Sequence, residues 1–124
     1  MSQDKKVRIE SDLLGSREIP ADALYGVQTL RGVENFPISH FHLNEYPLFI
    51  KGLAITKMGA AAANHELGLL SDELYNAIMQ ACDEVAEGKH DKEFPVDMIQ
   101  GGAGTTTNMN ANEVIANRAL QIMG

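Results

Sequence analysis

Gln100-Gly-Gly-Ala-Gly-Thr-Thr-Thr-Asn-Met-Asn-Ala-Asn-Glu113 is a glycine-rich stretch that runs directly into an apolar helical pattern over residues 114–120. Three glycines within four residues permit positive φ angles and let the backbone approach a ligand closely. Free backbone amides before a helix N-terminus favour the binding of a small anion. The stretch therefore predicts either an anion-binding loop or, more simply, a tight turn that feeds a capped helix.

The kind of anion follows from what this stretch lacks. No Gly-Lys-Ser/Thr sequence ends it, so the lysine of a phosphate-binding P-loop is missing. The dinucleotide pattern Gly-x-Gly-x-x-Gly also fails, because Thr107 stands where the last glycine is required. A carboxylate is therefore expected rather than a nucleotide.

Two helices are expected before the loop. The first covers residues 47–68, and its predicted core stripe is Phe49, Leu53, Ala60, Ala63 and Leu67. The second begins after Ser71, which is a suitable N-cap, and ends at Gly88. Its predicted core stripe is Leu74, Ile78, Cys82 and Val85.

A further helix is expected after the loop. Asn110-Ala-Asn-Glu113 resembles a capping box, in which Asn110 is the N-cap and Glu113 reaches back to it. The apolar side of this helix is predicted to contain Val114, Ile115, Ala119 and Ile122.

The N-terminal part predicts a hairpin followed by a short helix. Apolar and charged residues alternate over residues 7–11, and a second strand over residues 16–19 follows the break at Gly15. Pro20 is a good helix entry, so a helix over residues 20–33 is expected, ended by Asn35-Phe36-Pro37. The plan is mainly α, and its thin apolar stripes favour packing into a larger helical assembly.

Composition limits the class of protein. The 124 residues suit one domain, and the net charge of −7 with scattered basic residues disfavours nucleic-acid binding. The single cysteine, Cys82, excludes an intramolecular disulfide, and neither a secretory signal nor a membrane span is visible, so a cytoplasmic protein is expected. His40 and His42 lack a third ligand at a useful spacing, so no metal and no cofactor are expected.

Four segments, and the loop most of all, resemble the fumarase/aspartase superfamily, and the aspartate ammonia-lyase branch most closely. They are residues 13–20, 23–29, 34–36 and 94–113. The run Gly-x-Gly-Thr-x-x-Asn-Met-Asn-x-Asn-Glu is strongly specific for this superfamily, and similarity covers residues 7–124. Class II fumarases carry a serine where Ala103 stands here, which favours the aspartase branch.

The resemblance implies both a fold and an activity. The fold would be an N-terminal helical domain with a small β hairpin, covering residues 1–124, that leads into a central helical bundle. The enzyme would be a homotetrameric lyase with composite active sites, and its reaction the reversible deamination of L-aspartate to fumarate and ammonia.

The resemblance also implies substrate-binding residues. Thr105 is the expected ligand of the substrate carboxylate, helped by the backbone amides around Gly104 and Thr106. Fixed neutral donors strengthen as negative charge develops on carboxylate oxygens, which suits removal of the neighbouring proton. Asn110 matches an asparagine of the motif, with a structural role equally open, and Arg31 is a weaker candidate because a matching arginine follows the Tyr-Gly segment in aspartases.

Other segments of the family do not occur in these 124 residues. In the family, a mobile Gly-Ser-Ser-x-Met-Pro-x-Lys-x-Asn loop carries the general-base serine and a carboxylate-binding lysine. No catalytic residue is therefore expected here, and we expect the chain to be part of a longer enzyme and inactive alone. A class II fumarase segment and a non-catalytic helical interaction module remain as alternatives.

Overall fold

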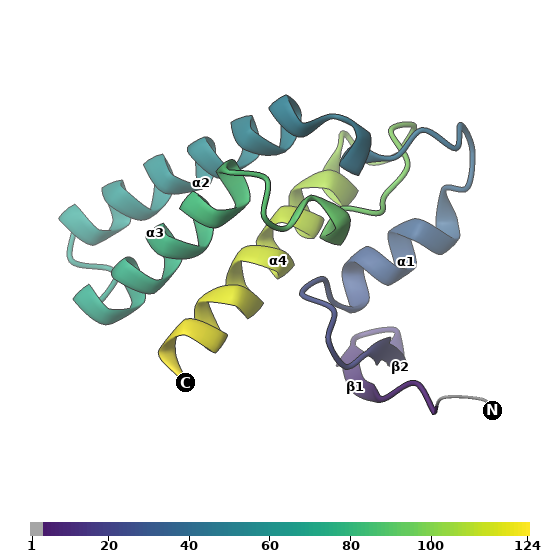
Figure 1. The fold of residues 1–124 in the computed structure, drawn as a ribbon, viewed down its shortest axis with the longest axis horizontal. Coiled ribbons are helices and arrows are strands. Elements are labelled where there is room, and N and C mark those ends of the chain that lie inside the picture. Colours follow the sequence, from purple (N-terminus) through teal and green to yellow (C-terminus); the bar gives the residue numbers. More distant parts are fainter. Residues whose placement is uncertain (1–3) are drawn as a thin grey trace.

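The computed structural model describes residues 4–124 and shows a mainly helical chain with one two-stranded sheet (Figure 1). The elements are β1 (Val7–Asp12), β2 (Gly15–Pro20), α1 (Val27–Asn35), η1 (Leu43–Glu45), α2 (Pro47–Glu66), α3 (Asp72–Ala86), η2 (Asp91–Glu93) and α4 (Thr105–Met123). The predicted mainly α fold with a small hairpin is therefore confirmed. Among the described residues, none of the helices combines the length and apolar character needed to cross a bilayer.

Helix α4 lies between the other helices. It packs against α3 and against α1, while α2 packs mainly on α3. In Figure 1, α4 crosses the middle of the fold, with α2 and α3 to its left and α1 to its right. The main core joins these helices to the connector over residues 94–100, which precedes the glycine-rich stretch. Its fully buried members include Ile50, Ala54, Cys82, Val85, Phe94, Val96 and Val114.

The predicted core stripe of α2 is wrong except at Leu53, which packs against the core. Its buried residues are Ile50, Ala54 and Ala61, whereas the side chains of Phe49 and Leu67 are 49% and 73% exposed. Because α2 is apolar around most of its circumference, periodicity alone could not select the face that meets α3.

The start of α3 follows the sequence prediction. The hydroxyl of Ser71 accepts a hydrogen bond of 3.2 Å from the amide of Leu74, which confirms the N-cap. On the predicted stripe of this helix, Cys82 and Val85 are buried and Ile78 packs against the core, but Leu74 is 39% exposed. Gly88 follows the helix with a positive φ of 83°, as expected for a helix end.

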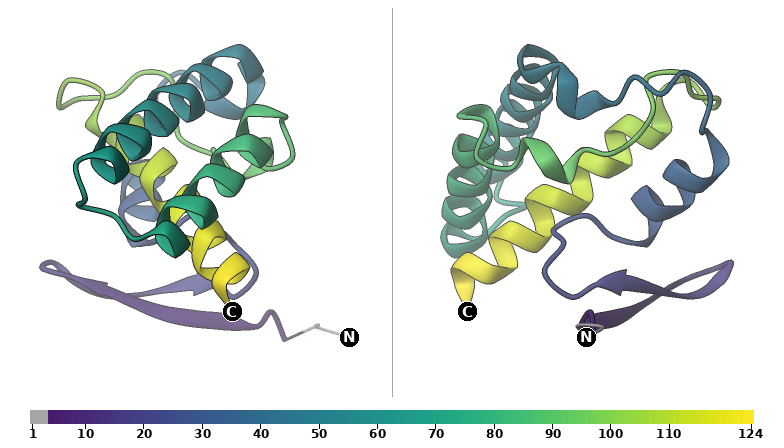
Figure 2. Two further views of the ribbon diagram at one scale, coloured as in Figure 1. Left: turned by 90° about the vertical axis from the view of Figure 1, so that its left-hand side faces the viewer. Right: turned by 45° about the vertical axis from the view of Figure 1, so that its right-hand side comes forward.

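The hairpin is confirmed, but the helix predicted from Pro20 is wrong at its start. Strands β1 and β2 are antiparallel, and Pro20 pairs with Val7 as the last residue of β2. The Arg8 guanidinium donates to the carbonyl oxygens of Pro20, Ala23 and Tyr25 at 2.9, 2.6 and 2.7 Å. These bonds hold residues 20–26 in a turn, so α1 begins only at Val27. Figure 2 shows the hairpin projecting below α1, away from α2.

The predicted capping box at Asn110 is also wrong. The N-cap of α4 lies six residues earlier, at Gly104, which adopts a left-handed conformation (φ 78°). Asn110 is therefore inside the helix, fully buried, and its Nδ2 donates to the Glu93 carbonyl oxygen at 2.9 Å. Glu113 does not reach back; its Oε1 accepts the amide of Thr29 in α1 at 2.9 Å.

Candidate anion-binding site

The glycine loop, residues 101–104, ends in a left-handed coil. Gly102, Ala103 and Gly104 have φ angles of 72°, 55° and 78°. This conformation suits glycine, and at Ala103 it costs about 1–2 kcal/mol. The coil turns the chain directly into α4, so Thr105 becomes the first helical residue and lies exposed at the N-terminus.

Among the described residues, the hydrogen bonds around the glycine loop leave two amides at the start of α4 free, in addition to those of Gly101, Gly102 and Ala103. The amide and hydroxyl of Thr105 both donate to the carbonyl oxygen of Gly102, at 3.1 and 2.6 Å. The amide of Thr107 donates to Gln100 Oε1 at 3.1 Å. Within residues 4–124, the amides of Gly104 and Thr106 have no protein acceptor. The N-terminus of a 19-residue helix with two free amides favours an anion.

The Thr105 hydroxyl has one proton, which now points to Gly102. To donate to a substrate carboxylate, this hydroxyl must leave the Gly102 carbonyl by a change of side-chain rotamer. Because Thr105 is exposed, such a change meets no packed neighbour.

Thr106 offers its amide but not its side chain. A Cβ at Gly32 of α1 would lie 2.3 Å from Thr106 Cγ2, so the threonine methyl fills the space above this glycine. Gly32 thus lets α1 approach the first turn of α4 closely and orients Thr106 with its side chain inward.

A hollow of about 410 Å³ adjoins the glycine loop. Its apolar wall comes from α2 and the connector, and its polar wall from the loop and the first turn of α4. The lining residues are Phe49, Leu53, Met98, Gln100, Gly104, Thr107 and Asn108. Of the described residues, no lysine, arginine or histidine lines this hollow. The lining itself therefore offers an anion only amides and hydroxyls, although the ammonium group of Lys57 in α2 donates to Asn108 Oδ1 at 2.6 Å.

The other two candidate residues lie outside this group of donors. Asp12 binds the Arg31 guanidinium through two bonds of 2.8 Å, and Arg31 also donates to the Gly15 carbonyl oxygen at 3.2 Å. The hydrogen bond from Arg31 holds the pKa of Asp12 below its usual range. The structure thus brings together Gly104, Thr105 and Thr106. It uses Arg31 to fix the hairpin and buries Asn110, so the substrate-binding roles of these two residues stay predictions.

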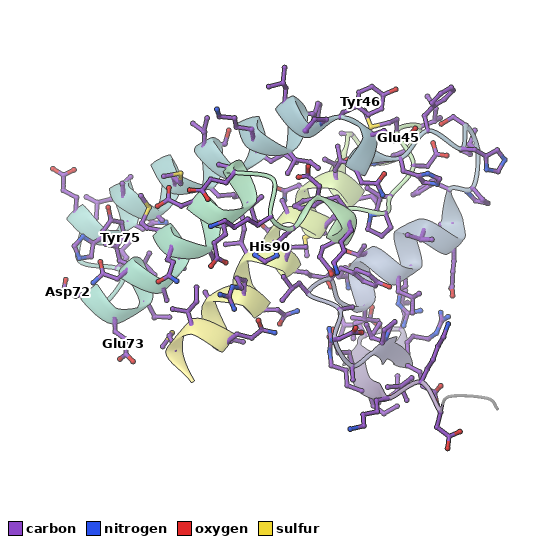
Figure 3. The ribbon with its side chains drawn as sticks, in the orientation of Figure 1. Glu45, Tyr46, Asp72, Glu73, Tyr75 and His90 are labelled. Atoms are coloured by element: carbon purple, nitrogen blue, oxygen red, sulfur yellow. The ribbon has the colours of Figure 1, made fainter. Side chains whose placement is uncertain are left out.

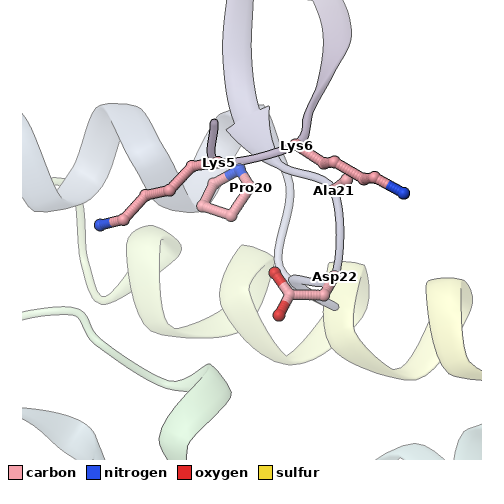
Figure 4. Close-up of a pocket in the computed structure, with 5 residues that line it drawn as sticks. All are labelled: Lys5, Lys6, Pro20, Ala21 and Asp22. Carbon is pink, nitrogen blue, oxygen red and sulfur yellow. The ribbon is translucent and has the colours of Figure 1, made fainter. Parts of the chain in front are cut away.

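A second hollow, of about 600 Å³, lies at the base of the hairpin and not at the glycine loop. Lys5, Lys6, Pro20, Ala21 and Asp22 line it, and in Figure 4 the two lysine side chains extend in opposite directions. Their charges do not converge on one point, so this hollow offers no anion site. Across residues 4–124, no group of three or more His, Cys, Asp or Glu side chains could hold a metal ion.

Asp97 and Ser39, which hold the chain just before the glycine loop, were not identified from the sequence. Asp97 is 3% exposed and accepts hydrogen bonds from Ser39 Oγ and from the amides of Ser39, His40 and Ile99, at 2.7 to 2.9 Å. Burial alone would raise the pKa of Asp97, but these bonds hold it well below its usual range. Ser39 is 58 residues away along the chain, so no local pattern could have indicated this anchor.

Known proteins are similar to this chain over almost its whole length. A family model described as a lyase matches residues 15–124. The chain is 60% identical to the aspartate ammonia-lyase of a Bacillus species over 118 residues, which are 95% of this chain and 25% of that protein. It is 55% identical to aspartate ammonia-lyase of Escherichia coli K12, again over 95% of this chain and 25% of the relative.

Solved structures show the same fold. The fumarate lyase:delta crystallin of Brucella melitensis matches with a TM-score of 0.94 and 52% identity, over 96% of this chain and 28% of that one. The class II fumarase of Schistosoma mansoni matches with a TM-score of 0.89 and 39% identity, over 95% and 25%. The chain therefore spans about a quarter of the length of the relatives it matches.

Proposed function

Since the chain belongs to the lyase family, we propose that it contributes the substrate-carboxylate-binding loop of an enzyme that reversibly deaminates L-aspartate to fumarate and ammonia. The observation that carries the proposal is the end of α4, where Thr105 lies beside the free amides of Gly104 and Thr106. The identity of 55–60% to aspartate ammonia-lyases favours this substrate. By the same likeness, we propose a cytoplasmic homotetramer.

The chemistry explains why neutral donors suit this site. Removal of a proton from the carbon next to a carboxylate moves charge onto the carboxylate oxygens. Amides of Gly104 and Thr106, fixed at a helix N-terminus, bind these oxygens more strongly as that charge develops. These two amides need no reorganisation during the reaction, and the proton acceptor and the balancing cation come from other segments of the enzyme.

The experiment replaces Thr105 with alanine in the whole enzyme. If its hydroxyl binds the developing oxyanion, kcat/KM for aspartate falls by a factor of about 10². Thr56→Ala is the matched control, because Thr56 is also an exposed helical threonine whose hydroxyl bonds a carbonyl oxygen, that of Gly52 at 2.9 Å. Fumarate formation is followed by its ultraviolet absorbance. An unchanged kcat/KM in Thr105→Ala would remove Thr105 from the site.

A class II fumarase is the second candidate, favoured by the structural match to the Schistosoma mansoni enzyme. Ala103 disfavours this candidate, because class II fumarases carry a serine at this position and the alanine side chain has no hydroxyl. Formation of malate from fumarate without any requirement for ammonia would support the fumarase, whereas ammonia-dependent consumption of fumarate would support the aspartase.

A further inference from the structure

We propose that Gln100 is a positioning residue that holds the free amides of the glycine loop in place for the substrate carboxylate. The inference rests on the proposed function. Its evidence is the set of hydrogen bonds that Gln100 forms with Thr107 and Asp97. Gln100 precedes the glycine loop, and Thr107 lies in the first turn of α4.

The Gln100 side chain connects the two ends of the glycine loop. Its Oε1 accepts the amide of Thr107 at 3.1 Å, and its Nε2 donates to Thr107 Oγ1 at 2.6 Å. The second proton of Nε2 goes to the carbonyl oxygen of Asp97 at 2.8 Å. The oxygen and the nitrogen of the side-chain amide are therefore both hydrogen-bonded. The two bonds to Thr107 close a loop that contains residues 101–106.

This link replaces the missing N-cap side chain of α4. The first four amides of a helix have no acceptor within it, and a side chain at the N-cap usually satisfies one of them. Gly104 has no side chain, so Gln100 performs this role from four residues earlier and satisfies Thr107. The bond fixes where the helix begins, and with it the direction of the neighbouring Thr106 amide.

The support of Gln100 is itself buried and held by hydrogen bonds. Asp97, whose carbonyl oxygen accepts from Gln100, is buried and bonded through its carboxylate to Ser39, His40 and Ile99. Gln100 thus transmits the position of this buried anchor to the first turn of α4. Donors that are held before the substrate arrives lose less entropy on binding, which strengthens the bound state.

The test compares Gln100→Met with the unchanged protein, in the whole enzyme. Methionine has a similar length but forms none of the three hydrogen bonds. Succinate, a dicarboxylate that cannot react, serves as the probe of binding. We expect its Kd to rise about tenfold, as for the loss of one well-aligned charge-assisted bond, while the far-ultraviolet circular dichroism stays unchanged. Gln80→Met, on the exposed surface of α3, is the control and leaves Kd unchanged.

A second variant guards against misfolding of the first. Thr107→Val removes the hydroxyl that Gln100 Nε2 contacts but keeps the Thr107 amide, and Kd for succinate should rise about threefold. In the double variant, the rise should be smaller than the product of the single rises, because both changes break one link. A lowered Tm with an unchanged Kd in both single variants would show a purely structural role and overturn the inference.

The outcome also separates this inference from the proposed function. If Thr105→Ala lowers kcat/KM but neither Gln100→Met nor Thr107→Val changes Kd, only the positioning role fails. If the whole enzyme neither binds succinate nor forms fumarate from aspartate, the proposed function fails with it.

Discussion

Glu84 joins α3 to α4 through Arg118 and also contacts His90, which follows α3. The Arg118 Nε and Nη2 atoms lie 2.5 and 3.0 Å from its carboxylate oxygens, and His90 Nε2 lies at 3.0 Å. Figure 3 shows His90 beside α4, at the centre of the fold. The hydrogen bond from Arg118, assisted by His90, outweighs burial and lowers the pKa of Glu84 to about 2. The Glu84 side chain is only 15% exposed, so solvent screens its ion pair with Arg118 less than it screens an ordinary surface ion pair.

At the residue scale, we predict that Arg118→Met lowers the free energy of unfolding by about 1–2 kcal/mol at pH 7. Because the pKa of Glu84 is lowered from 4.5 to about 2, the stabilisation is complete above pH 4.5 and is lost as the pH falls through 2. Urea unfolding from pH 7 down to pH 2 measures it. Arg17→Met, which breaks the more exposed pair with Glu34, is the control and should change little. A difference for Arg118→Met that stays constant down to pH 2 would contradict the assignment.

At the scale of the element, α1 owes its start to two carboxylates from other elements. Glu10 of β1 accepts the amide of Val27 at 3.0 Å, and Glu113 of α4 accepts that of Thr29 at 2.9 Å. Negative charge at a helix N-terminus is favourable. Burial, together with the charge of Glu10, raises the pKa of Glu113. The two carboxylates fit only because Gly26 has no side chain between them.

We therefore predict that Gly26→Ala destabilises the protein by about 2 kcal/mol. The new Cβ would lie 1.9 Å from Glu113 Oε2 and 2.6 Å from Glu10 Oε1, so both carboxylates must move away from the amides of α1. Gly59→Ala is the matched control in α2, where a Cβ meets nothing within 4 Å, and it should stabilise by about 0.5–1 kcal/mol. Thermal unfolding of both variants measures the difference. Equal Tm values would refute the capping role of Glu10 and Glu113.

At the scale of the whole molecule, the outer side of α2 is an exposed apolar surface. Leu48, Phe49 and Ile55 are 82%, 49% and 54% exposed. The chain spans about a quarter of the length of its relatives. Together with the hollow beside the glycine loop, which has no cation, these features support the view that the described chain holds part of an active site.

We accordingly predict that residues 1–124 alone form no fumarate from aspartate, because the proposed proton acceptor lies outside the glycine loop and α4. The whole enzyme, assayed by ultraviolet absorbance under the same conditions, is the positive control. Measurable turnover by the isolated chain, purified away from any host lyase, would overturn this prediction.

The sequence by itself determined the features that depend on neighbouring residues. The hairpin follows from two alternating segments around Leu13-Leu14-Gly15, and the start of α3 follows from the hydroxyl of Ser71. The left-handed turn into α4 follows from the glycines of the loop, and the superfamily motif lies in the same contiguous stretch. Each of these rests on φ angles or hydrogen bonds between residues a few positions apart, so a local pattern carries the information.

Only the tertiary structure decided which residues surround that turn. The buried face of α2, the start of α1 under Arg8 and Glu10, and the Asp97 anchor all depend on contacts with distant segments. The sequence pattern predicts a capping box at Asn110. In the structure, this asparagine is buried and bonded to Glu93, and the N-cap of the helix is Gly104. The face of α2 is selected by apolar packing, mainly against α3. The polar contacts form because most buried polar groups pair with a group that is near in space, wherever in the chain it lies. Neither cause leaves a periodic signal in the sequence.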